Sequence, residues 1–396
     1  MPAGEVNEAV NIIIAPDSFK GSLTALEAAD AILQGVREVM PEAEVASVPM
    51  ADGGEGTTEA LVVATGGRTK RVEVTGPLGD PVTALLGLLG DDVTGVVECA
   101  QACGLSLIAP ERRDVLHATT HGVGELILAA LDAGCTKLIV GLGGSATNDG
   151  GAGMAQALGV RLLDAHGSEL GRGAGPLVSL HHIDTARLDE RIGAVAVCAA
   201  SDVTNPLCGP SGASAVYGPQ KGASAELIPR LEEALANYAA VIARDVGADI
   251  RDVPGAGAAG GLAAGLMAFC GARVRSGANL VLEMFAFEEL LESADLVLTG
   301  EGRIDGQTRF GKAISAVGLL AQKHAVPVIA FTGCLAEEPA KLAEGGITSV
   351  APILPGPMGE EEAIAQAGDL LQAAAERVMR TLLVGRGLGD GRWPLR

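Results

Sequence analysis

The sequence predicts an α/β protein of two domains, one of which is a doubly wound parallel sheet formed by both ends of the chain. Short aliphatic runs alternate with helical patterns near both ends of the 396 residues, as in βαβ units. Hydrophobic residues make up 48% of the chain but aromatic residues only 2%, so the core consists of the aliphatic side chains typical of buried parallel strands. Many of the 56 glycines lie in loops after these runs, where a backbone without Cβ atoms can approach a ligand closely.

The beginning of the chain predicts a βαβα unit. Residues 11–15 are an aliphatic run that ends before a proline, which is typical of a buried first strand. Thr24 and Glu27 have the spacing of a capping box, and apolar residues follow at helical spacing. A second strand is predicted at residues 45–48 and a second helix at residues 57–64.

The rest of the chain predicts further strands and helices, spaced less regularly in the middle than toward the end. In the middle, strands are predicted at residues 93–97, 138–140 and 194–197, and helices at 120–133, 225–243 and 258–269. Toward the end, strands are predicted at residues 296–299, 326–331 and 347–352, and helices at 312–324 and 360–383. We therefore expect residues 1–75 and 284–396 to form a discontinuous doubly wound domain. Residues 76–283 are expected to form an inserted α/β domain, with the active site in the cleft between the two.

Charge, cysteine content and hydropathy argue against several classes of protein. The net charge of −21 argues against the basic face that nucleic acids and anionic membranes require. The seven cysteines have no disulfide-like spacing, which favours reduced thiols in the cytoplasm. The uncharged stretch between Asp252 and Arg273 contains a proline and several glycines, so it predicts a glycine loop and a buried helix rather than a membrane span. We expect a cytoplasmic monomer or homodimer that acts on small molecules, without a nucleic-acid or membrane partner.

The most informative segment is the glycine-rich stretch at residues 141–153. It lies after a predicted strand and before a helical segment, an arrangement that directs backbone N–H groups toward a phosphate. Its polar side chains, which can bind phosphate oxygens and a metal ion, are Ser145, Thr147, Asn148 and Asp149. The stretch matches neither the P-loop pattern nor the dinucleotide fingerprint, so it predicts phosphate binding of another kind.

Two polar clusters follow the first two predicted strands. Asp17, Ser18 and Lys20 come directly after the first strand, where α/β sheets usually bind their ligands. Asp52 and Glu55 alternate with three glycines in the loop that opens the second helix. The structural alternatives are a capped turn for the first cluster and acidic partners of a helix dipole for the second. A lysine in the first and the glycines in the second favour a functional interpretation of both.

Later strands are followed by further candidates. Asp202 and Asn205 come after a predicted strand, where a carboxylate can hold a metal or deprotonate a hydroxyl; an Asx turn is the alternative. Lys221 lies in a glycine-containing loop and can reach a phosphate. Arg303 offers a planar fork for a carboxylate, with a surface ion pair as the alternative. This combination of glycine loops, hydroxyls, acids and isolated cations suits phosphoryl transfer assisted by Mg²⁺.

Several stretches, taken in chain order, carry a family resemblance. They are Ile14-Ala-Pro-Asp-Ser-Phe-Lys, Pro49-Met-Ala-Asp-Gly-Gly-Glu-Gly-Thr, Thr75-Gly-Pro-Leu-Gly-Asp, Gly143-Gly-Ser-Ala-Thr-Asn-Asp-Gly-Gly-Ala-Gly, Ser201-Asp-Val-Thr-Asn-Pro, Tyr217-Gly-Pro-Gln-Lys-Gly, Val253-Pro-Gly-Ala-Gly-Ala-Ala-Gly-Gly and Thr299-Gly-Glu-Gly-Arg-Ile-Asp. In this order they resemble the bacterial glycerate kinases of the glycerate kinase type 1 family. The resemblance implies a Rossmann-like domain built from both chain ends and a separate α/β domain between them. It also implies ATP-dependent phosphorylation of D-glycerate with Mg²⁺, generally to 2-phosphoglycerate.

Within this resemblance, the chemistry of the clusters predicts how ATP and Mg²⁺ are held. The residues expected to contact the nucleotide phosphates are Gly143, Gly144, Ser145, Thr147 and Asn148. Asp149 and Asp202 are expected to hold Mg²⁺, since carboxylates are its usual protein ligands. Lys20 or Lys221 is expected to neutralise the transferred phosphoryl group.

The acceptor side of the reaction is predicted in the same way. Arg303 is expected to bind the glycerate carboxylate, and Asp52 or Asp202 to accept the proton of the hydroxyl. The other predicted substrate contacts are Asp17, Ser18 and Asn205. The alternatives are a kinase for another small hydroxy acid, a glycerate kinase that forms 3-phosphoglycerate, and a non-catalytic metabolite or nucleotide sensor. The acids present in every cluster disfavour the sensor, because binding alone does not need so many.

Overall fold

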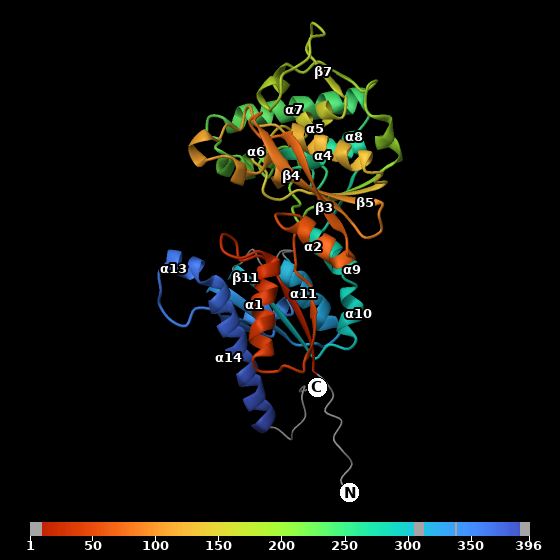
Figure 1. Cartoon of the computed structure of the whole chain (residues 1–396). Coiled ribbons are helices and arrows are strands. Elements are labelled where there is room, and N and C mark those ends of the chain that lie inside the picture. Colours follow the sequence, from red (N-terminus) through yellow and green to blue (C-terminus); the bar gives the residue numbers. More distant parts are fainter. Residues whose placement is uncertain (1–9, 305–312, 337–338, 389–396) are drawn as a thin grey trace. The chain divides into compact units, whose positions relative to one another are not determined.

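The chain divides into two compact units in the computed structural model, which describes residues 10–304, 313–336 and 339–388. The chain-end unit comprises Met1–Ala51 and Ala278–Arg396, and the middle unit comprises Asp52–Gly277. Each unit contains a β-sheet and helices, labelled in Figure 1. The α/β class predicted from the sequence is confirmed.

The chain-end unit is built on a sheet of five parallel strands in the order β13-β12-β11-β1-β2. The strands are β1 (Asn11–Pro16), β2 (Glu44–Ser47), β11 (Leu296–Ile304), β12 (Val328–Leu335) and β13 (Ser349–Pro352). From β1 the chain proceeds to β2, and from β11 it proceeds to β12 in the opposite direction along the sheet. The β1–β11 boundary is therefore a topological switch point, where α/β sheets commonly bind ligands.

Two helices cover this sheet with apolar faces. Helices α1 (Ala25–Arg37) and α14 (Ala367–Leu388) pack side by side (Figure 1), and both contribute to the core that buries Ile14 of β1 and Leu298 of β11. The predicted capping box begins α1, since the Thr24 hydroxyl accepts a hydrogen bond from the Glu27 N–H at 3.2 Å. The other helices from these parts of the chain are α9 (Gly277–Met284), α10 (Phe287–Leu291), α11 (Ala313–Lys323), α12 (Pro339–Glu344) and α13 (Glu360–Ala365).

The middle unit contains a six-stranded mixed sheet in the order β10-β9-β6-β5-β4-β3. Its strands are β3 (Arg68–Thr75), β4 (Pro81–Leu88), β5 (Thr94–Glu98), β6 (Lys137–Gly141), β9 (Ala196–Ala200) and β10 (Arg273–Arg275). A small second sheet pairs β7 (Arg161–Leu163) with β8 (His182–Asp184). Because β5, β6, β9 and β10 are parallel, their carboxyl ends lie at the same end of the sheet.

Seven α-helices are described in the middle unit, and all but the first contribute to one core. They are α2 (Thr57–Thr65), α3 (Cys99–Cys103), α4 (His121–Asp132), α5 (Ala152–Ala157), α6 (Ala213–Tyr217), α7 (Ile228–Asp245) and α8 (Leu262–Cys270). The core is mainly aliphatic, with Tyr238 of α7 as its largest fully buried side chain. Among all described residues, no helix is both long enough and apolar enough to cross a membrane.

Some elements differ from the sequence prediction for physical reasons. The sequence prediction misses β4, and it misses β3 because β3 is a mostly exposed edge strand with polar side chains. The predicted helix at residues 258–269 yields α8 only from Leu262, since Ala259 and Gly260 have positive φ angles of 53° and 66°. The start of the helix predicted at residues 312–324 lies outside the described residues.

The boundaries of the compact units also differ from the expected ones. The division falls after Ala51 and after Gly277, rather than after residues 75 and 283. The reason is local packing: β3 pairs with β4, and α2 packs against β4 and β5. Residues 52–75 therefore belong to the middle unit.

Candidate functional site

Three parallel strands of the middle unit end next to one another and lead into the predicted glycine and acidic loops. The register places Glu98 of β5 beside Gly141 of β6, and Gly141 beside Ala200 of β9. The Leu142 N–H continues this pairing by donating to the Ala200 carbonyl at 3.1 Å. The glycine loop after β6 and the Ser201–Asn205 segment after β9 thus start from neighbouring positions.

The backbone of the glycine loop (residues 141–153) packs closely against the loop that contains Asp52. The Gly143 N–H donates to the Gly53 carbonyl at 2.9 Å. A Cβ atom on Gly143 would lie 2.4 Å from the Gly54 Cα, and one on Gly53 would lie 2.3 Å from the Ala200 carbonyl oxygen. Larger residues would force the backbones apart, so these glycines permit the close contact. The Asp52 carboxylate accepts a hydrogen bond from the Gly54 N–H at 3.0 Å. This contact holds the side chain of Asp52 against the backbone of its own loop.

Lys221 lies beneath the glycine loop and donates directly to it. Its Nζ lies 2.9 Å from the Ser145 hydroxyl and 2.6 Å from the Thr147 carbonyl oxygen, and its side chain is only 3% exposed. Burial lowers the pKa of Lys221 to about 8, against smaller opposing effects of Cys103, Cys99 and Asp149. The structure therefore brings together the predicted residues Lys221, Ser145 and Thr147. The ammonium of Lys221 lies under the loop and has a lowered pKa. An ammonium has three donors, and these two contacts use two of them.

The far side of the loop is fixed by amide and hydroxyl groups. The Asn148 amide donates to the Ser214 hydroxyl at 2.9 Å. The Asn205 amide donates to the Ser211 carbonyl at 2.7 Å, and its oxygen accepts the Tyr217 hydroxyl at 2.8 Å. Asn205 thus bonds the backbone at Ser211 and the side chain of Tyr217, which gives it a structural role besides the predicted substrate contact.

Asp149, predicted as a metal ligand, is bonded to Thr120 and to the backbone of its own loop. Its side chain is completely buried, and it accepts hydrogen bonds from the Thr120 N–H at 2.9 Å and the Thr120 hydroxyl at 3.0 Å. It also accepts the N–H groups of Gly151 and Gly153 at 3.1 and 3.2 Å. Burial raises the pKa of Asp149, whereas these hydrogen bonds oppose the rise. These four hydrogen bonds hold the loop together, and the predicted metal role of Asp149 stays a prediction.

The described residues contain no ready-made metal site of side chains. Residues 10–304, 313–336 and 339–388 contain no group of three or more His, Cys, Asp or Glu side chains arranged to hold a metal ion. Asp202, which is partly buried, lies two residues beyond β9 in the loop next to the glycine loop. Of the two predicted metal ligands, Asp149 is fully buried and Asp202 is partly exposed, and the metal role of both stays a prediction.

The remaining predicted residues lie at the switch point of the chain-end unit. The Asp17 N–H donates to the Gly300 carbonyl at 2.8 Å, so the segment after β1 lies against the end of β11. The Asp17 carboxylate accepts the Ser18 N–H at 2.6 Å. Lys20 and Arg303 are both exposed on these adjacent segments. The structure thus brings the four predicted residues of this unit to one end of its sheet, while the Asp305 of the same motif lies outside the described residues.

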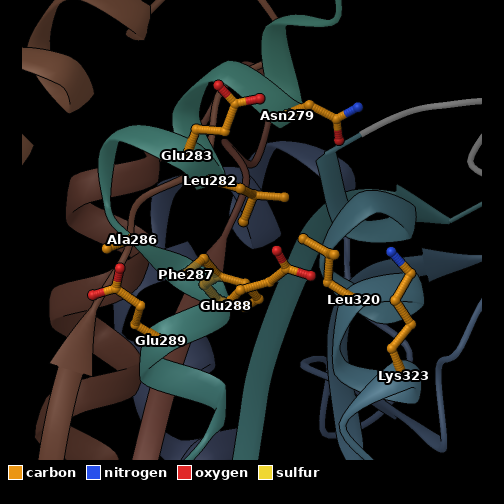
Figure 2. Close-up of a pocket in the computed structure, with 9 residues that line it drawn as sticks. All are labelled: Asn279, Leu282, Glu283, Ala286, Phe287, Glu288, Glu289, Leu320 and Lys323. Atoms are coloured by element: carbon orange, nitrogen blue, oxygen red, sulfur yellow. The ribbon is translucent and has the colours of Figure 1, made fainter.

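A pocket of about 420 Å³ in the chain-end unit contains none of the predicted residues (Figure 2). It lies among α9, α10 and α11, and its lining residues are Asn279, Leu282, Glu283, Ala286, Phe287, Glu288, Glu289, Leu320 and Lys323. Three carboxylates and a single ammonium give the lining a negative formal charge. Such a pocket suits neither an anionic hydroxy acid nor nucleotide phosphates.

Glu98 is a buried acid that the sequence interpretation overlooks. Its side chain is 1% exposed, and its carboxylate accepts the Thr58 N–H at 2.5 Å. The available signal was an acidic residue at the very end of an otherwise aliphatic strand. Such a residue is either exposed or held by specific donors.

Comparisons with known proteins agree with this architecture. Residues 12–383 match the model of the glycerate kinase family. The chain is 48% identical over 376 residues to glycerate 2-kinase of Escherichia coli K12, covering 95% of this chain and 99% of that protein. It is 48% identical over 377 residues to glycerate kinase of Bacillus subtilis 168, with the same shares covered. A crystal structure of a protein assigned as glycerate kinase 2 from Salmonella typhimurium LT2 superposes with a TM-score of 0.85 at 49% identity, covering 96% of this chain and 100% of that one.

Proposed function

The chain belongs to the glycerate kinase family and is a phosphotransferase, and we propose that it transfers the γ-phosphoryl group of ATP to the 2-hydroxyl of D-glycerate, forming ADP and 2-phosphoglycerate. The observation that carries this proposal is the contact of buried Lys221 with Ser145 and Thr147 of the glycine loop. The choice of the 2-hydroxyl is supported by the name of the Escherichia coli relative, a glycerate 2-kinase.

The glycine loop and Lys221 are assigned to the phosphate groups of ATP. The transition state of phosphoryl transfer spreads negative charge over the phosphoryl oxygens, and fixed donors and cations stabilise it. A lysine that is already held and desolvated loses little entropy when it meets that charge, and its field is weakly screened. Gly143 and Gly144 permit close approach of the backbone, and Ser145, Thr147 and Asn148 fix the loop around Lys221.

Mg²⁺ is assigned to Asp202, with Asp52 as its candidate partner. Mg²⁺ binds through one or two carboxylates together with substrate phosphates and water, so it does not need a dedicated cluster of protein ligands. The carboxylate of Asp52 lies in the loop that contacts Gly143, and Asp202 follows the neighbouring strand. These donors fit a nucleotide-bound Mg²⁺, which would neutralise charge on the phosphates.

The acceptor side is assigned to a carboxylate base and to cations. Asp202 or Asp52 accepts the proton that leaves the hydroxyl as it attacks. In the chain-end unit, Arg303 is assigned to the glycerate carboxylate, because its guanidinium can make two parallel hydrogen bonds to it. The other residues assigned to the acceptor side at that end of the sheet are Lys20, Asp17 and Ser18.

The test begins with the purified protein, ATP, Mg²⁺ and D-glycerate. We expect ADP release that requires all three, and release with other small hydroxy acids at much lower kcat/KM. Enolase is then added alone to the product, because 2-phosphoglycerate gives phosphoenolpyruvate directly and 3-phosphoglycerate does not. Product that enolase leaves unchanged would favour the 3-phosphoglycerate alternative, and no ADP release would favour a sensor.

A further inference from the structure

Glu98 occupies a position that connects the two loops assigned to catalysis. It is the last residue of β5, and its backbone partner in the register is Gly141, the last residue of β6. A Cβ atom on Gly141 would lie 3.6 Å from the Glu98 Cγ and 2.7 Å from the Gly53 carbonyl oxygen. The side chain of Glu98 therefore lies where the glycine loop and the Asp52 loop meet.

The carboxylate of Glu98 supplies a cap that the sequence of α2 lacks. The residue before α2 is Gly56, and no side chain of the cap position bonds the first turn. The Thr58 N–H in that turn donates instead to Glu98 at 2.5 Å. Because the first N–H groups of a helix have no partner within it, this contact ties the start of α2 to the end of β5.

The loop between Asp52 and α2 is short and held at both ends. At one end, the Gly53 carbonyl accepts the Gly143 N–H. At the other end, Glu98 holds Thr58. Releasing Thr58 would remove the hold at the helix end while the Gly53–Gly143 contact remains, so the part of the loop next to α2 would gain freedom relative to the glycine loop.

We infer that Glu98 is a positioning residue that holds the Asp52 loop in register with the glycine loop through Thr58. The inference rests on the proposed function, in which these loops carry the carboxylate and the phosphate contacts. Glu98 does not itself touch the substrate in this role. It acts by fixing the backbone on which Asp52 is carried, as supporting groups around catalytic residues commonly do.

Two further observations, the unsatisfied polar atoms around Glu98 and its pKa, support this positioning role. The second oxygen of Glu98, Oε2, and the Thr58 hydroxyl are both buried without a hydrogen-bond partner among the described residues. A buried carboxyl with only part of its hydrogen bonds costs stability. We infer that its role in holding the Asp52 loop offsets this cost. Burial raises the pKa of Glu98, and the hydrogen bond from the Thr58 N–H opposes this rise, so a neutral side chain of the same shape should be accepted here.

The experiment compares Glu98→Gln and Glu98→Ala with the native enzyme. Glutamine keeps an oxygen for the Thr58 N–H, whereas alanine removes it. We expect Glu98→Ala to lower kcat by about 10- to 100-fold, the usual effect of removing a supporting group, and Glu98→Gln to stay within about threefold of the native value. Hydrogen exchange measured by mass spectrometry on peptides covering residues 52–60 should become faster in Glu98→Ala and stay native-like in Glu98→Gln.

Glu125→Ala is the matched control. Glu125 likewise accepts a backbone N–H, that of Thr75 at 2.5 Å, but it holds β3 rather than the glycine loops. Its loss should leave kcat and the exchange of residues 52–60 unchanged.

Each outcome decides the inference. If Glu98→Ala folds with native kcat, if exchange of residues 52–60 is unchanged, or if Glu125→Ala gives the same loss, the positioning role is overturned. If Glu98→Ala fails to fold, Glu98→Gln decides. Native-like exchange and kcat in Glu98→Gln support the role of the Thr58 contact, whereas faster exchange of residues 52–60 with reduced kcat overturns it, because the amide keeps an oxygen for the Thr58 N–H. The proposed function fails separately, when ADP release or 2-phosphoglycerate is absent in the native enzyme.

Discussion

The two candidate clusters differ in how firmly the fold holds their charged groups. In the middle unit, Lys221 is buried and bonded to two groups of the glycine loop. In the chain-end unit, Lys20 and Arg303 are exposed at the end of the β1–β11 pair. A buried, preorganised charge acts mainly on the transition state, whereas an exposed charge is screened and contributes modest binding energy. Changes in the middle unit should therefore act on kcat, and changes at the chain-end switch point on KM.

The largest expected effect is the loss of the catalytic base. Asp202→Asn keeps the shape of the side chain but removes its basicity, so we expect kcat to fall by about 10²- to 10⁴-fold, the usual contribution of general base catalysis. Asp52→Asn is measured in parallel, and the residue with the larger loss of kcat at saturating Mg²⁺ is assigned as the base. Near-native turnover in both variants would remove the two carboxylates from the chemistry.

Loss of the buried cation should be the next largest effect. Lys221→Met retains most of the side-chain volume without the charge, and we expect a loss of about 10²- to 10³-fold in kcat, as for removal of one preorganised stabilising group. The matched control is Lys137→Met, because Lys137 is exposed and pairs with Asp91 at 3.8 Å, a contact of little energetic weight. Equal kinetics in the two variants would contradict the contrast between buried and exposed cations.

The pH dependence of kcat/KM should report the titration of Lys221. The pKa of Lys221 is lowered to about 8, so its ammonium is present below that pH and is lost as the pH rises through it. We expect kcat/KM to fall above about pH 8. The contribution of Lys221 to the unfolding free energy changes in the opposite sense: between about pH 8 and the ordinary lysine value of 10.5, the unfolded chain binds more protons, so that contribution increases with pH. The residual activity of Lys221→Met is measured over the same pH range. If its kcat/KM still falls above about pH 8, the fall arises from the titration of another group.

A smaller effect is expected at the exposed cluster. Arg303→Gln should raise the KM for glycerate by about tenfold, the equivalent of one charge-assisted hydrogen bond, while the KM for ATP and kcat change little. Arg68→Gln is the control, since Arg68 forms an exposed ion pair with Asp92 at 3.0 Å in the middle unit. A fall in kcat without a change in KM would show that Arg303 acts on the transition state instead.

The smallest expected effect on catalysis belongs to Asp149. Asp149→Asn turns an NH₂ group toward donors that now bond a carboxylate, so we expect the unfolding free energy to fall by about 1–3 kcal/mol. Urea unfolding measures this loss, and kcat per folded molecule should change less than in Asp202→Asn. Native stability combined with a raised Mg²⁺ requirement would support the predicted metal role instead.

The sequence predicted those features that depend on neighbouring residues in the chain. The aliphatic runs located β1 and β6, and the capping box located α1, because their signals lie within a few residues. The family resemblance predicted from the motifs is confirmed by the match over residues 12–383. The roles predicted for the individual site residues stay predictions.

What the sequence missed depends on contacts between distant residues. The structural role of Asp149 depends on Thr120, 29 residues earlier, and that of Glu98 on Thr58, 40 residues earlier. The interruption before α8 arises where a Cβ atom on Gly260 would lie 1.9 Å from the Thr147 carbonyl oxygen. Periodicity and spacing carry no information about such partners.

The central claim is that Lys221 beneath the glycine loop meets the phosphates of ATP. The most direct measurement is an NMR titration of the enzyme with ¹³C-labelled lysine, with the Lys221 signal assigned by its loss in Lys221→Met. In the free enzyme we predict a pKa near 8, and on saturation with a non-hydrolysable ATP analogue and Mg²⁺ we predict a clear rise, because a nearby anion favours the charged form. A Lys221 pKa that is unchanged by the bound nucleotide would contradict the assignment of this loop to phosphate binding.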